Sequence, residues 1–430
     1  MERLFMDQMV LGRREAPGLI VLCGGLSSRM GTDKASLPWR GGTLLMHRLC
    51  RGAHEGFGEI IIATNTAPNL STLPGQLIIT HPLAEGGAGQ RMLESEELQA
   101  VAINNTYEWR VTPKQTVLLR IVSDVHKQCG PLSGLEAGLT AGTHETYRVL
   151  AVDTPFFEEP KDAPYQTLRP LPGRVTPLCL IPRVDGQPQP LAGLYSKRCL
   201  AAVTALLNRG DFKLRSLYDL VATSFFDDDD HQYQYMNMNR PADYQQAKAI
   251  DALLQRQKPI ISVVASRSKT GKTLVVEGLI KALKDYGLTV GLVKSDGHGF
   301  AMDTPGTDTA RATEAGATAV AIAGPNDYAI IDHGVRIDDL TELANRLTSE
   351  VVLIESRSRG VVPIIEVVRD NHTEALITSV GDLWAVIGDK ASWPNNTAAL
   401  AFTFDETAEL AKHIYEDLIV PVKALRQAEA

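Results

Sequence analysis

Residues 19–34 read LIVLCGGLSSRMGTDK and carry the strongest signal in the first half of the chain. An uninterrupted apolar run, Leu19–Cys23, leads into a loop that contains two glycines and several hydroxyl and basic side chains. Because glycine lacks a Cβ, backbone N–H groups in such a loop can approach a phosphate closely. A continuous apolar run of this length favours a strand buried on both faces, as in a parallel sheet covered by helices. The stretch therefore predicts an α/β fold that binds a phosphate-bearing ligand.

A second stretch of the same kind, residues 259–273, reads PIISVVASRSKTGKT. The apolar run Ile260–Val264 leads into a phosphate-binding loop of the form GxxxxGK[ST]. Serine replaces the first glycine at position 266, and a serine constrains the turn. The backbone N–H groups, the lysine and the magnesium-binding hydroxyl are still expected to serve. The nucleotide-binding residues expected in this loop are Ser266, Thr270, Gly271, Lys272 and Thr273.

The two loops divide the chain into two halves that do not repeat one another in sequence. The chain has 430 residues, which is too many for one hydrophobic core. Residues 241–256 predict a helix, and the sequence Gln257-Lys258-Pro259 breaks it. We therefore expect two domains, residues 1–255 and residues 256–430, with a Rossmann-like α/β unit followed by a P-loop NTPase-like α/β unit.

Residues 83–118 fit this plan poorly, because they form no clear strand–helix unit. We interpret them as an insertion into the first domain, either a lid, a partly ordered excursion or a dispensable surface loop. The acidic run Asp227–Asp230 is short, and we interpret it as a solvated turn rather than a metal site.

Composition excludes several classes of protein. With 44% hydrophobic and 22% charged residues, the chain is neither wholly disordered nor a fibrous repeat. A net charge of −8 and 6% aromatic residues argue against a nucleic-acid partner, although a local phosphate pocket is compatible with them. The five cysteines are odd in number and form no CxxC, so neither a disulfide framework nor a zinc site is predicted. No signal peptide or bilayer-spanning run is evident, so we expect a cytoplasmic protein without a membrane partner.

Asp153 is the candidate metal ligand of the first half. It ends the apolar strand predicted at Val149–Val152, at the edge where α/β sheets bind ligands. A carboxylate there suits Mg²⁺, which takes its other ligands from water and nucleotide phosphates. Together with Lys34 and the loop amides, such an ion would neutralise charge on an α-phosphate and a departing pyrophosphate. An Asx-turn before Pro155 is the competing interpretation of Asp153.

The first loop resembles the signature LxGGxSxRMGxDKxxL of the molybdenum cofactor guanylyltransferases, a branch of the nucleotidyltransferases. The chain matches it at Leu22, Gly24, Gly25, Ser27, Arg29, Met30, Gly31, Asp33, Lys34 and Leu37, with Cys23 where alanine is usual. Further motifs of that family follow in order: Asn65, Asp124 before the loop 130–134, Asp153 in DTPF, residues 185–195 (DGQPQPLAGLY) and residues 237–243 (NMNRPAD). The resemblance covers residues 17–250 and implies a GT-A-like nucleotidyltransferase fold.

This resemblance also implies roles for individual residues. The catalytic residues implied are Arg29, Lys34 and Asp153, and Asp153 is implied as the ligand of Mg²⁺. Asn65 is implied to lie near the guanine or the ribose. The nucleotide contacts implied are Leu22, Cys23, Gly24, Gly25, Lys34, Asn65, Asp124 and Asp153.

Residues 259–417 resemble the molybdopterin-guanine dinucleotide biosynthesis adaptor family. The resemblance rests on the P-loop, on PGTDTARATEAGA at 305–317, and on Glu355 at the end of an apolar strand. An acid at the end of that strand is typical of a Walker B segment, so Thr273 and Glu355 are implied to face a magnesium ion. Ser356 replaces the glycine that is usual in the family. We interpret His298 as a polar loop residue, and Arg311 with Glu314 as a surface ion pair.

Together the two resemblances imply a bifunctional protein of cofactor maturation. The first half would transfer GMP from GTP to the phosphate of molybdopterin and release pyrophosphate. The second half would bind GTP, with weak GTPase activity, and assist transfer or delivery. The partners implied are GTP, molybdopterin, molybdopterin-inserting proteins, apo-molybdoenzymes and, by analogy, a second copy in a homodimer. Two alternatives stay open: a cytidylyl- or other nucleotidyltransferase, and a non-catalytic GTP-binding adaptor or carrier.

Overall fold

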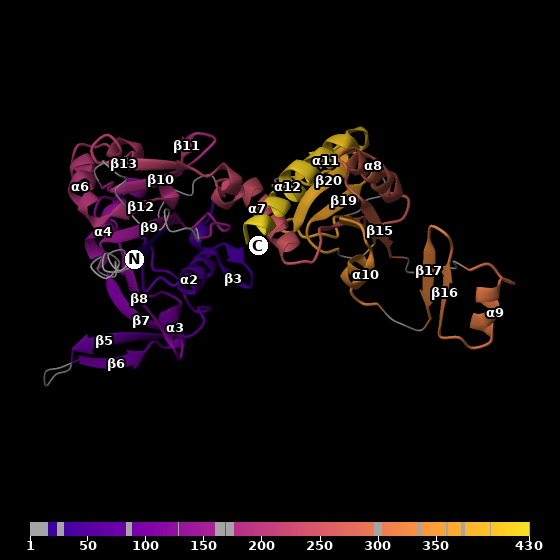
Figure 1. Ribbon diagram of the computed structural model, residues 1–430, viewed down its shortest axis with the longest axis horizontal. Coiled ribbons are helices and arrows are strands. Elements are labelled where there is room, and N and C mark those ends of the chain that lie inside the picture. The colour runs from indigo at the N-terminus through magenta and orange to yellow at the C-terminus, as the bar shows by residue number, and fades with distance from the viewer. Residues whose placement is uncertain are drawn as a thin grey trace, which may run out of the picture. The chain divides into compact units, whose positions relative to one another are not determined.

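The computed structural model describes residues 16–23, 30–82, 88–127, 129–159, 168, 176–295, 303–333, 337–357, 360–370, 375–395 and 397–429 (Figure 1). The chain forms two compact units, Met1–Asp243 with Gln427–Ala430, and Tyr244–Arg426. Helix α7 (Pro241–Leu254) runs across the junction at residue 243. Because this helix ends at Leu254, we keep a boundary near residue 255 as a proposal.

The first unit is built on one mixed sheet. Its described strands are β1 (Gly18–Leu22), β4 (Glu59–Ala63), β5 (Gln76–Pro82), β6 (Ala88–Met92), β7 (Asn105–Thr112), β8 (Gln115–Val122), β9 (Thr146–Ala151), β10 (Cys179–Val184), β11 (Gln187–Pro188), β12 (Leu194–Ser196) and β13 (Thr223–Asp227). They follow the order β11-β10-β12-β9-β1-β4-β8-β7-β5-β6, and β13 pairs with β10. The four central strands, β9-β1-β4-β8, are parallel, so their carboxyl ends lie at one edge of the sheet. A separate hairpin joins β2 (Pro38–Trp39) to β3 (Gly42–Thr43).

Helices cover both faces of this parallel centre. The described helices of the first unit are α2 (Leu44–His54), α3 (Ser95–Leu98), α4 (Pro131–Ala141) and α6 (Leu200–Asn208). Successive side chains of a strand point to opposite faces. In β1, Ile20 therefore packs in one cluster with α4 and α6, whereas Leu19 lies against Gly52 of α2. Residues 19–22 are all buried, and the predicted α/β class with strands covered on both faces is confirmed.

Much of the described part of 83–118 forms strands. Strands β6 and β7 lie there, and Gln115–Leu118 begin β8, which pairs directly with the central strand β4. In β7 the two buried residues, Tyr107 and Trp109, are separated by one residue that is not buried. This alternation differs from the continuous apolar runs of the central strands, which is why the sequence pattern did not reveal these strands. Residues 83–87 lie outside the described residues.

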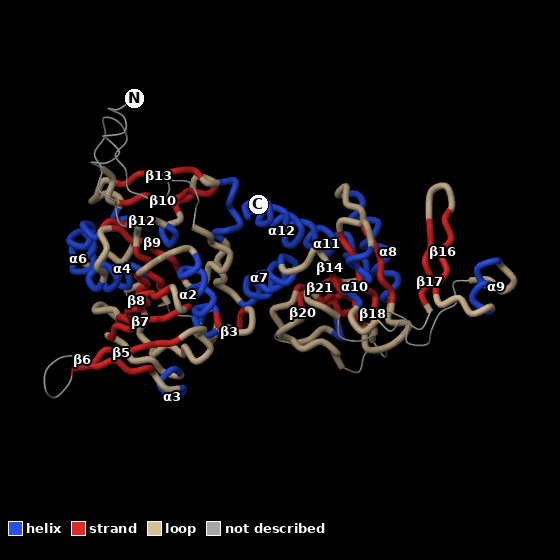
Figure 2. Tube along the Cα trace, turned by 60° about the horizontal axis from the view of Figure 1, so that its bottom comes forward, coloured by secondary structure: helices blue, strands red, loops and turns tan. Residues whose placement is uncertain are grey.

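The second unit has a parallel sheet and an antiparallel hairpin. The sheet consists of β14 (Ile260–Val264), β15 (Val290–Lys294), β18 (Val351–Ser356), β19 (Ile364–Val368), β20 (Leu383–Gly388) and β21 (Leu400–Phe402), in the order β15-β18-β14-β19-β20-β21. Its pairings are all parallel. The hairpin joins β16 (Ala319–Ala323) to β17 (Tyr328–Asp332), and both views show it standing beside the sheet rather than within it (Figures 1 and 2).

Helices also cover both faces of this second sheet. The described helices are α7, α8 (Lys272–Asp285), α9 (Asp308–Glu314), α10 (Leu340–Arg346), α11 (Thr407–His413) and α12 (Val420–Glu429), with a π-helical turn at Ile414–Ile419. Helix α10 packs on Ile260, Val352 and Ile354, while α8 packs beside α11 above the sheet (Figure 1). Within the described ranges no helix is long and apolar enough to cross a membrane.

We predict that Gly388→Ala destabilises the second unit by about 3 kcal/mol or more. Gly388 has φ of +145°, and a Cβ there would overlap the backbone carbonyl of Val368 on the neighbouring strand. The matched control is Gly381→Ala, because a Cβ at Gly381 meets no atom within 4 Å. Thermal unfolding followed by circular dichroism should show a lower midpoint for Gly388→Ala than for the unaltered chain, whereas Gly381→Ala should leave the midpoint unchanged. Equal midpoints for the two variants would contradict this account.

Candidate functional site

Asp153 lies just beyond the carboxyl end of β9, where its side chain pairs with Lys34 from a distant part of the chain. Lys34 Nζ donates to Asp153 Oδ2 over 2.6 Å and to Asn239 Oδ1 over 2.8 Å. Lys34 begins a short 3-10 turn whose first amide is capped by Asp33. The backbone N–H of Met238 donates to the carbonyl of Asp153 and fixes the segment that carries Asn239. Lys34, Asp153 and Asn239 thus form one polar cluster, and Asp153 is 8% exposed.

The donor atoms of this cluster fit a hard cation. The carboxylate oxygen of Asp153 and the amide oxygen of Asn239 converge on a single positive charge, the Lys34 ammonium. Oxygen ligands of these two types are those that Mg²⁺ takes from proteins, with nucleotide phosphates and water completing its shell. Among the described residues, no three His, Cys, Asp or Glu side chains lie close enough to hold a metal together.

A second polar pair lies on the neighbouring strands of the same edge. Asn65, after β4, donates from Nδ2 to Asp124 Oδ2 over 3.0 Å, and the Asp124 N–H donates back to Asn65 Oδ1 over 3.2 Å. Burial raises the pKa of the Asp124 carboxyl above its ordinary value, and the bond from Asn65 opposes this shift. A Cβ at Gly134 of α4 would lie 3.6 Å from Asp124 Oδ1, so the first turns of α4 border the pair.

The end of β1 lies between these two groups. Leu22 ends β1, and Cys23 continues its pairing because the Cys23 N–H donates to the carbonyl of Ala63 over 2.9 Å. Burial raises the pKa of the Cys23 thiol, and the nearby carboxylates Asp33 and Asp153 raise it further. The thiol is therefore uncharged at neutral pH. The predicted residues that follow, Gly24, Gly25 and Arg29, lie outside the described residues, as do Ser27 and Ser28.

Two side chains of α2 hold the segment immediately after Asp153. Arg48, which is 1% exposed, donates from Nη1 to the carbonyl of Phe157 over 3.1 Å and from Nη2 to the carbonyl of Thr154. His47 Nε2 lies 3.2 Å from the carbonyl oxygen of Pro155. Burial, reinforced by nearby arginines, lowers the pKa of His47 to about 3, so its ring is neutral at pH 7. Since a carbonyl only accepts, the hydrogen of this ring resides on Nε2.

The P-loop of the second unit joins β14 to α8. Its residues with positive φ are Lys269, at +62°, and Gly271, at +107°. Ser266 is not among them, so the position where the pattern expects glycine does not require glycine's backbone freedom. Its hydroxyl is buried and has no partner among the described residues. Thr270 is fully buried and donates from Oγ1 to the carbonyl of Arg267 over 3.2 Å.

Lys272 and Thr273 begin α8 and face the end of β18. Lys272 Nζ donates to the carbonyl of Arg267 over 3.0 Å, and Thr273 Oγ1 donates to Glu355 Oε1 over 3.2 Å. Burial lowers the pKa of Lys272 from its ordinary value; the cations Arg357 and Lys294 lower it further, while Glu355 raises it. The structure thus brings the expected Walker-type lysine, threonine and acid together. The oxygens of Thr273 and Glu355 are a donor pair that suits Mg²⁺.

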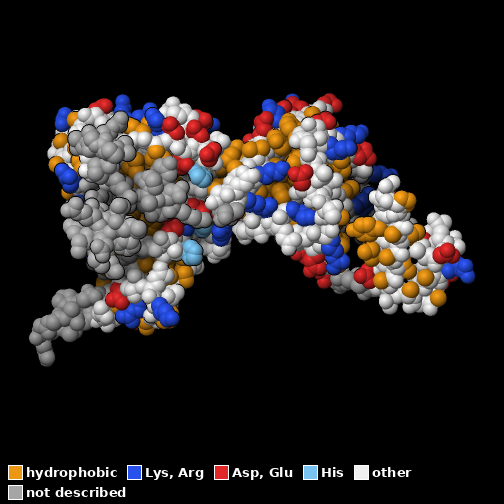
Figure 3. Space-filling view, in the orientation of Figure 1, with side chains coloured by type: hydrophobic (Ala, Val, Ile, Leu, Met, Phe, Trp, Pro, Cys, Tyr) orange, Lys and Arg blue, Asp and Glu red, His pale blue; other side chains and the backbone are white. Residues whose placement is uncertain are grey.

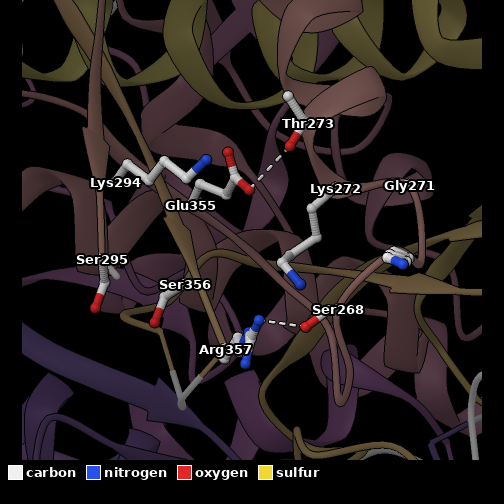
Figure 4. A pocket seen from close by; sticks show the side chains of 10 residues that line it. Ser268, Gly271, Lys272, Thr273, Lys294, Ser295, Glu355, Ser356 and Arg357 are labelled. Carbon is white, nitrogen blue, oxygen red and sulfur yellow. Dashed lines mark hydrogen bonds between the residues drawn. The ribbon is translucent and has the colours of Figure 1, made fainter. Parts of the chain in front are cut away.

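These groups line a cavity of about 360 Å³ (Figure 4). Its lining residues are Ser268, Lys269, Gly271, Lys272, Thr273, Lys294, Ser295, Glu355, Ser356 and Arg357. Four of them are cations and one is a carboxylate. Such an excess of positive charge over a loop of backbone N–H groups suits a polyphosphate.

Other expectations concern residues outside these two sites. Asp227 pairs with Arg183, and Asp228 accepts from His231 and Tyr235, so the acidic run makes local contacts. Arg311 lies 3.9 Å from Asp308, one turn away on α9. His298 lies outside the described residues.

Sequence reasoning missed several residues of the two sites. Asn239 lies within the NMNRPAD motif, but its contact with Lys34 spans 205 positions. Arg48 and His47 carried no motif, because their partners are backbone carbonyls. The remaining cavity residues without a sequence assignment are Ser268, Lys269, Lys294, Ser295 and Arg357. Only the run of basic residues in SRSKTGK and ESRSR offered a signal for the cations.

Two family models match the chain, one in each unit. Residues 19–95 and 90–226 match the family described as MobA-like NTP transferase domain. Residues 260–389 match the family described as Molybdopterin guanine dinucleotide synthesis protein B, or MobB. The first match contains Asn65, Asp124 and Asp153, and the second contains the P-loop and Glu355.

Curated relatives are similar to each half separately. A probable molybdenum cofactor guanylyltransferase of Halalkalibacterium halodurans is 33% identical over 131 residues, which are 29% of this chain and 65% of that relative. One of Bacillus licheniformis is 23% identical over 232 residues, 53% of this chain and 94% of the relative. A molybdopterin-guanine dinucleotide biosynthesis adapter protein of Haemophilus influenzae is 29% identical over 126 residues, 29% of this chain and 70% of the relative.

Proposed function

We propose that the chain is a bifunctional protein of molybdenum cofactor maturation, because its first unit matches the model of a MobA-like NTP transferase domain and its second unit matches the MobB model. Its first unit transfers GMP from GTP to the phosphate of molybdopterin, and pyrophosphate leaves. The product is a guanine dinucleotide of the cofactor. The guanylyltransferase and adapter names of the relatives support the same pathway for both halves.

The observation that carries this proposal is the pair of polar groups along one sheet edge. Asp153 follows β9 and the Asn65–Asp124 pair follows β4 and β8, so strand β1 ends between them. Adjacent strands lie about 4.8 Å apart, so the outer strands β9 and β8 are about 14 Å apart. A ligand that reaches both groups is extended. We place the phosphates of GTP at Asp153 and Lys34, and its guanosine at Asn65 and Asp124.

The side chains at the phosphate end suit phosphoryl transfer. The phosphate of molybdopterin attacks the α-phosphorus of GTP, and the bond to the bridging oxygen of pyrophosphate breaks. That attacking phosphate is largely ionised near pH 7, so it needs no strong general base. Lys34 neutralises charge on the transferring group, while Asp153 and Asn239 would hold the divalent ion. Mg²⁺, when bound there, supplies Lewis-acid stabilisation of the α-phosphate and of the leaving pyrophosphate.

In the second unit we propose GTP binding at the P-loop, with slow hydrolysis. Lys272 reaches the phosphates, and the hydroxyl of Thr273 and the carboxylate of Glu355 hold Mg²⁺. The excess of cations in the cavity supports this assignment. Binding there assists delivery of the product to molybdopterin-inserting proteins and apo-molybdoenzymes. All five cysteines are free thiols, which fits a reducing compartment, and we place the reaction in the cytoplasm.

The deciding experiment is an anaerobic assay of the full chain with molybdenum-loaded molybdopterin, Mg²⁺ and either GTP or CTP. We expect the guanine dinucleotide and pyrophosphate with GTP, and little product with CTP. Preference for CTP would change the substrate to that of a cytidylyltransferase. No product with either nucleotide would favour a non-catalytic GTP-binding carrier. Omission of Mg²⁺, followed by its replacement with Mn²⁺ or Ca²⁺, measures the metal requirement.

We also propose that the chain self-associates through the β16–β17 hairpin. Ile322, Tyr328 and Ile330 are 59%, 71% and 65% exposed there, and Figure 3 shows hydrophobic side chains gathered over it. Apolar side chains exposed together on a two-stranded hairpin suit association with a second copy. Sedimentation at micromolar concentration should give a dimer, and Ile322→Ser with Ile330→Ser should give a monomer. A monomeric unaltered chain would refute this interface, and Leu220→Ser, at another exposed leucine, is the control.

A further inference from the structure

Arg357 lines the P-loop cavity, and the sequence resemblance assigned it no role. It directly follows Ser356, the last residue of β18. In the pairing of β18 with β14, Glu355 lies beside Val263 and Ser356 beside Val264. Arg357 therefore lies beside the point where β14 ends and the phosphate-binding loop begins.

The side chain of Arg357 turns back over this loop. Its Nη2 donates to the hydroxyl of Ser268, and Figure 4 shows the guanidinium beside Ser268 on the side of the cavity away from Thr273. The Lys272 ammonium lies between these two ends of the cavity in the same view. Arg357 is exposed, so its guanidinium is held at the cavity rather than buried in the core. Among the described residues its hydrogen-bond partner is Ser268, and its other N–H groups form a planar fork that suits two phosphate oxygens.

The position of Arg357 relative to Lys272 indicates which phosphate it meets. In a P-loop the backbone N–H groups cradle the inner phosphates, and the lysine reaches the β- and γ-phosphates. The hydroxyl–carboxylate pair of Thr273 and Glu355 lies on the metal side of that lysine. Arg357 follows β18, the strand that carries Glu355, and lies on the opposite side of Lys272 from that pair. A terminal phosphate that extends beyond Lys272 would reach this position.

We propose that Arg357 binds the terminal phosphate of a nucleoside triphosphate and makes the P-loop unit select triphosphates over diphosphates. This inference rests on the proposed nucleotide binding at the P-loop. A diphosphate leaves Arg357 without its ligand, so it loses a charge-assisted hydrogen bond that a triphosphate makes. The selectivity gives the second unit two states, one with GTP and one with GDP, that differ in the contacts of Arg357.

The test measures binding of the N-methylanthraniloyl derivatives of GTP and GDP to the full chain in Mg²⁺. Because the first unit also binds GTP, the P-loop component is defined as the part of the titration that Lys272→Ala removes. We expect Arg357→Ala to weaken the P-loop component for the triphosphate by about 10- to 100-fold, and that for the diphosphate by less than about threefold. Arg357→Lys should restore part of the triphosphate affinity, because it returns the charge without the fork.

Two matched variants separate terminal-phosphate binding from support of the loop. Lys269 lines the same cavity but belongs to the loop itself, so Lys269→Ala should weaken both nucleotides alike. Ser268→Ala removes the partner of Arg357 and leaves the guanidinium, so it should keep most of the selectivity. If Ser268→Ala loses as much selectivity as Arg357→Ala, or if Arg357→Ala weakens both nucleotides equally, the inference is wrong. If Lys272→Ala removes no binding component, the proposed P-loop function itself fails.

Discussion

Replacing Asp153 by asparagine should lower the turnover of GMP transfer by about 10³-fold, the largest effect we expect from one substitution. The change removes the anionic ligand of the metal site but keeps the size and shape of the side chain. An amide oxygen in its place still accepts from the Lys34 ammonium, which lies 2.6 Å from the present carboxylate oxygen. The folded structure should therefore survive while the site loses the carboxylate that pairs with Lys34. Turnover is measured as guanine dinucleotide formed under saturating GTP and Mg²⁺.

Asp227→Asn is the matched control for this change. Asp227 carries a 61% exposed side chain that pairs with Arg183, and it is not a member of the cluster of Lys34, Asp153 and Asn239. It should leave turnover and unfolding unchanged, because exposed ion pairs contribute little. If Asp153→Asn keeps turnover within tenfold of the unaltered chain, Asp153 is not the metal carboxylate. Asp124, the other carboxylate at this edge, would then be the next residue to replace.

Asn65 and Asp153 follow short apolar runs, and strands of this kind tend to be parallel and buried. Asp124 was predicted only through the family motif, because the strand before it alternates in burial. Parallel strands place their carboxyl ends at one edge of the sheet, so residues that directly follow such strands lie at the same edge even when they are far apart in the chain. The hydrogen bond between Asn65 and Asp124 spans 59 positions and fits that rule. The P-loop was readable for a different reason, because its residues are consecutive.

Contacts without such regularity were not predictable. Arg48 acts on backbone carbonyls more than 100 positions away, and no motif marks a carbonyl. Strand β7 escaped because its apolar residues alternate, as expected for a strand with one face open to solvent. The sequence also suggested that serine in place of glycine at position 266 constrains the turn, but the backbone of the loop does not need glycine at that position. The loop places its positive φ angles at Lys269 and Gly271, so serine at position 266 keeps an ordinary conformation.

Arg48→Ala should also have a large effect, since it removes the two hydrogen bonds that Arg48 makes to the segment after Asp153. Two buried carbonyls lose their donor, and burial of the guanidinium lowers its pKa only to about 10, so the native side chain is charged at pH 7. We expect the first unit to lose about 3 kcal/mol of unfolding free energy. For a unit of this size the midpoint of thermal unfolding then falls by about 6–12 °C.

If Arg48 positions Asp153, the Arg48→Ala variant should also need more Mg²⁺ for turnover. A purely structural role of Arg48 would not change this requirement. With the carbonyls of Thr154 and Phe157 released from Arg48, the Asp153 carboxylate is held less firmly, so the Mg²⁺ concentration for half-maximal turnover should rise about tenfold. This is measured well below the lowered midpoint, where the variant remains folded. Arg48→Lys keeps the charge but reaches only one carbonyl, so its Mg²⁺ requirement should be intermediate. A folded Arg48→Ala chain with an unchanged Mg²⁺ requirement would show that Arg48 stabilises the unit without positioning Asp153.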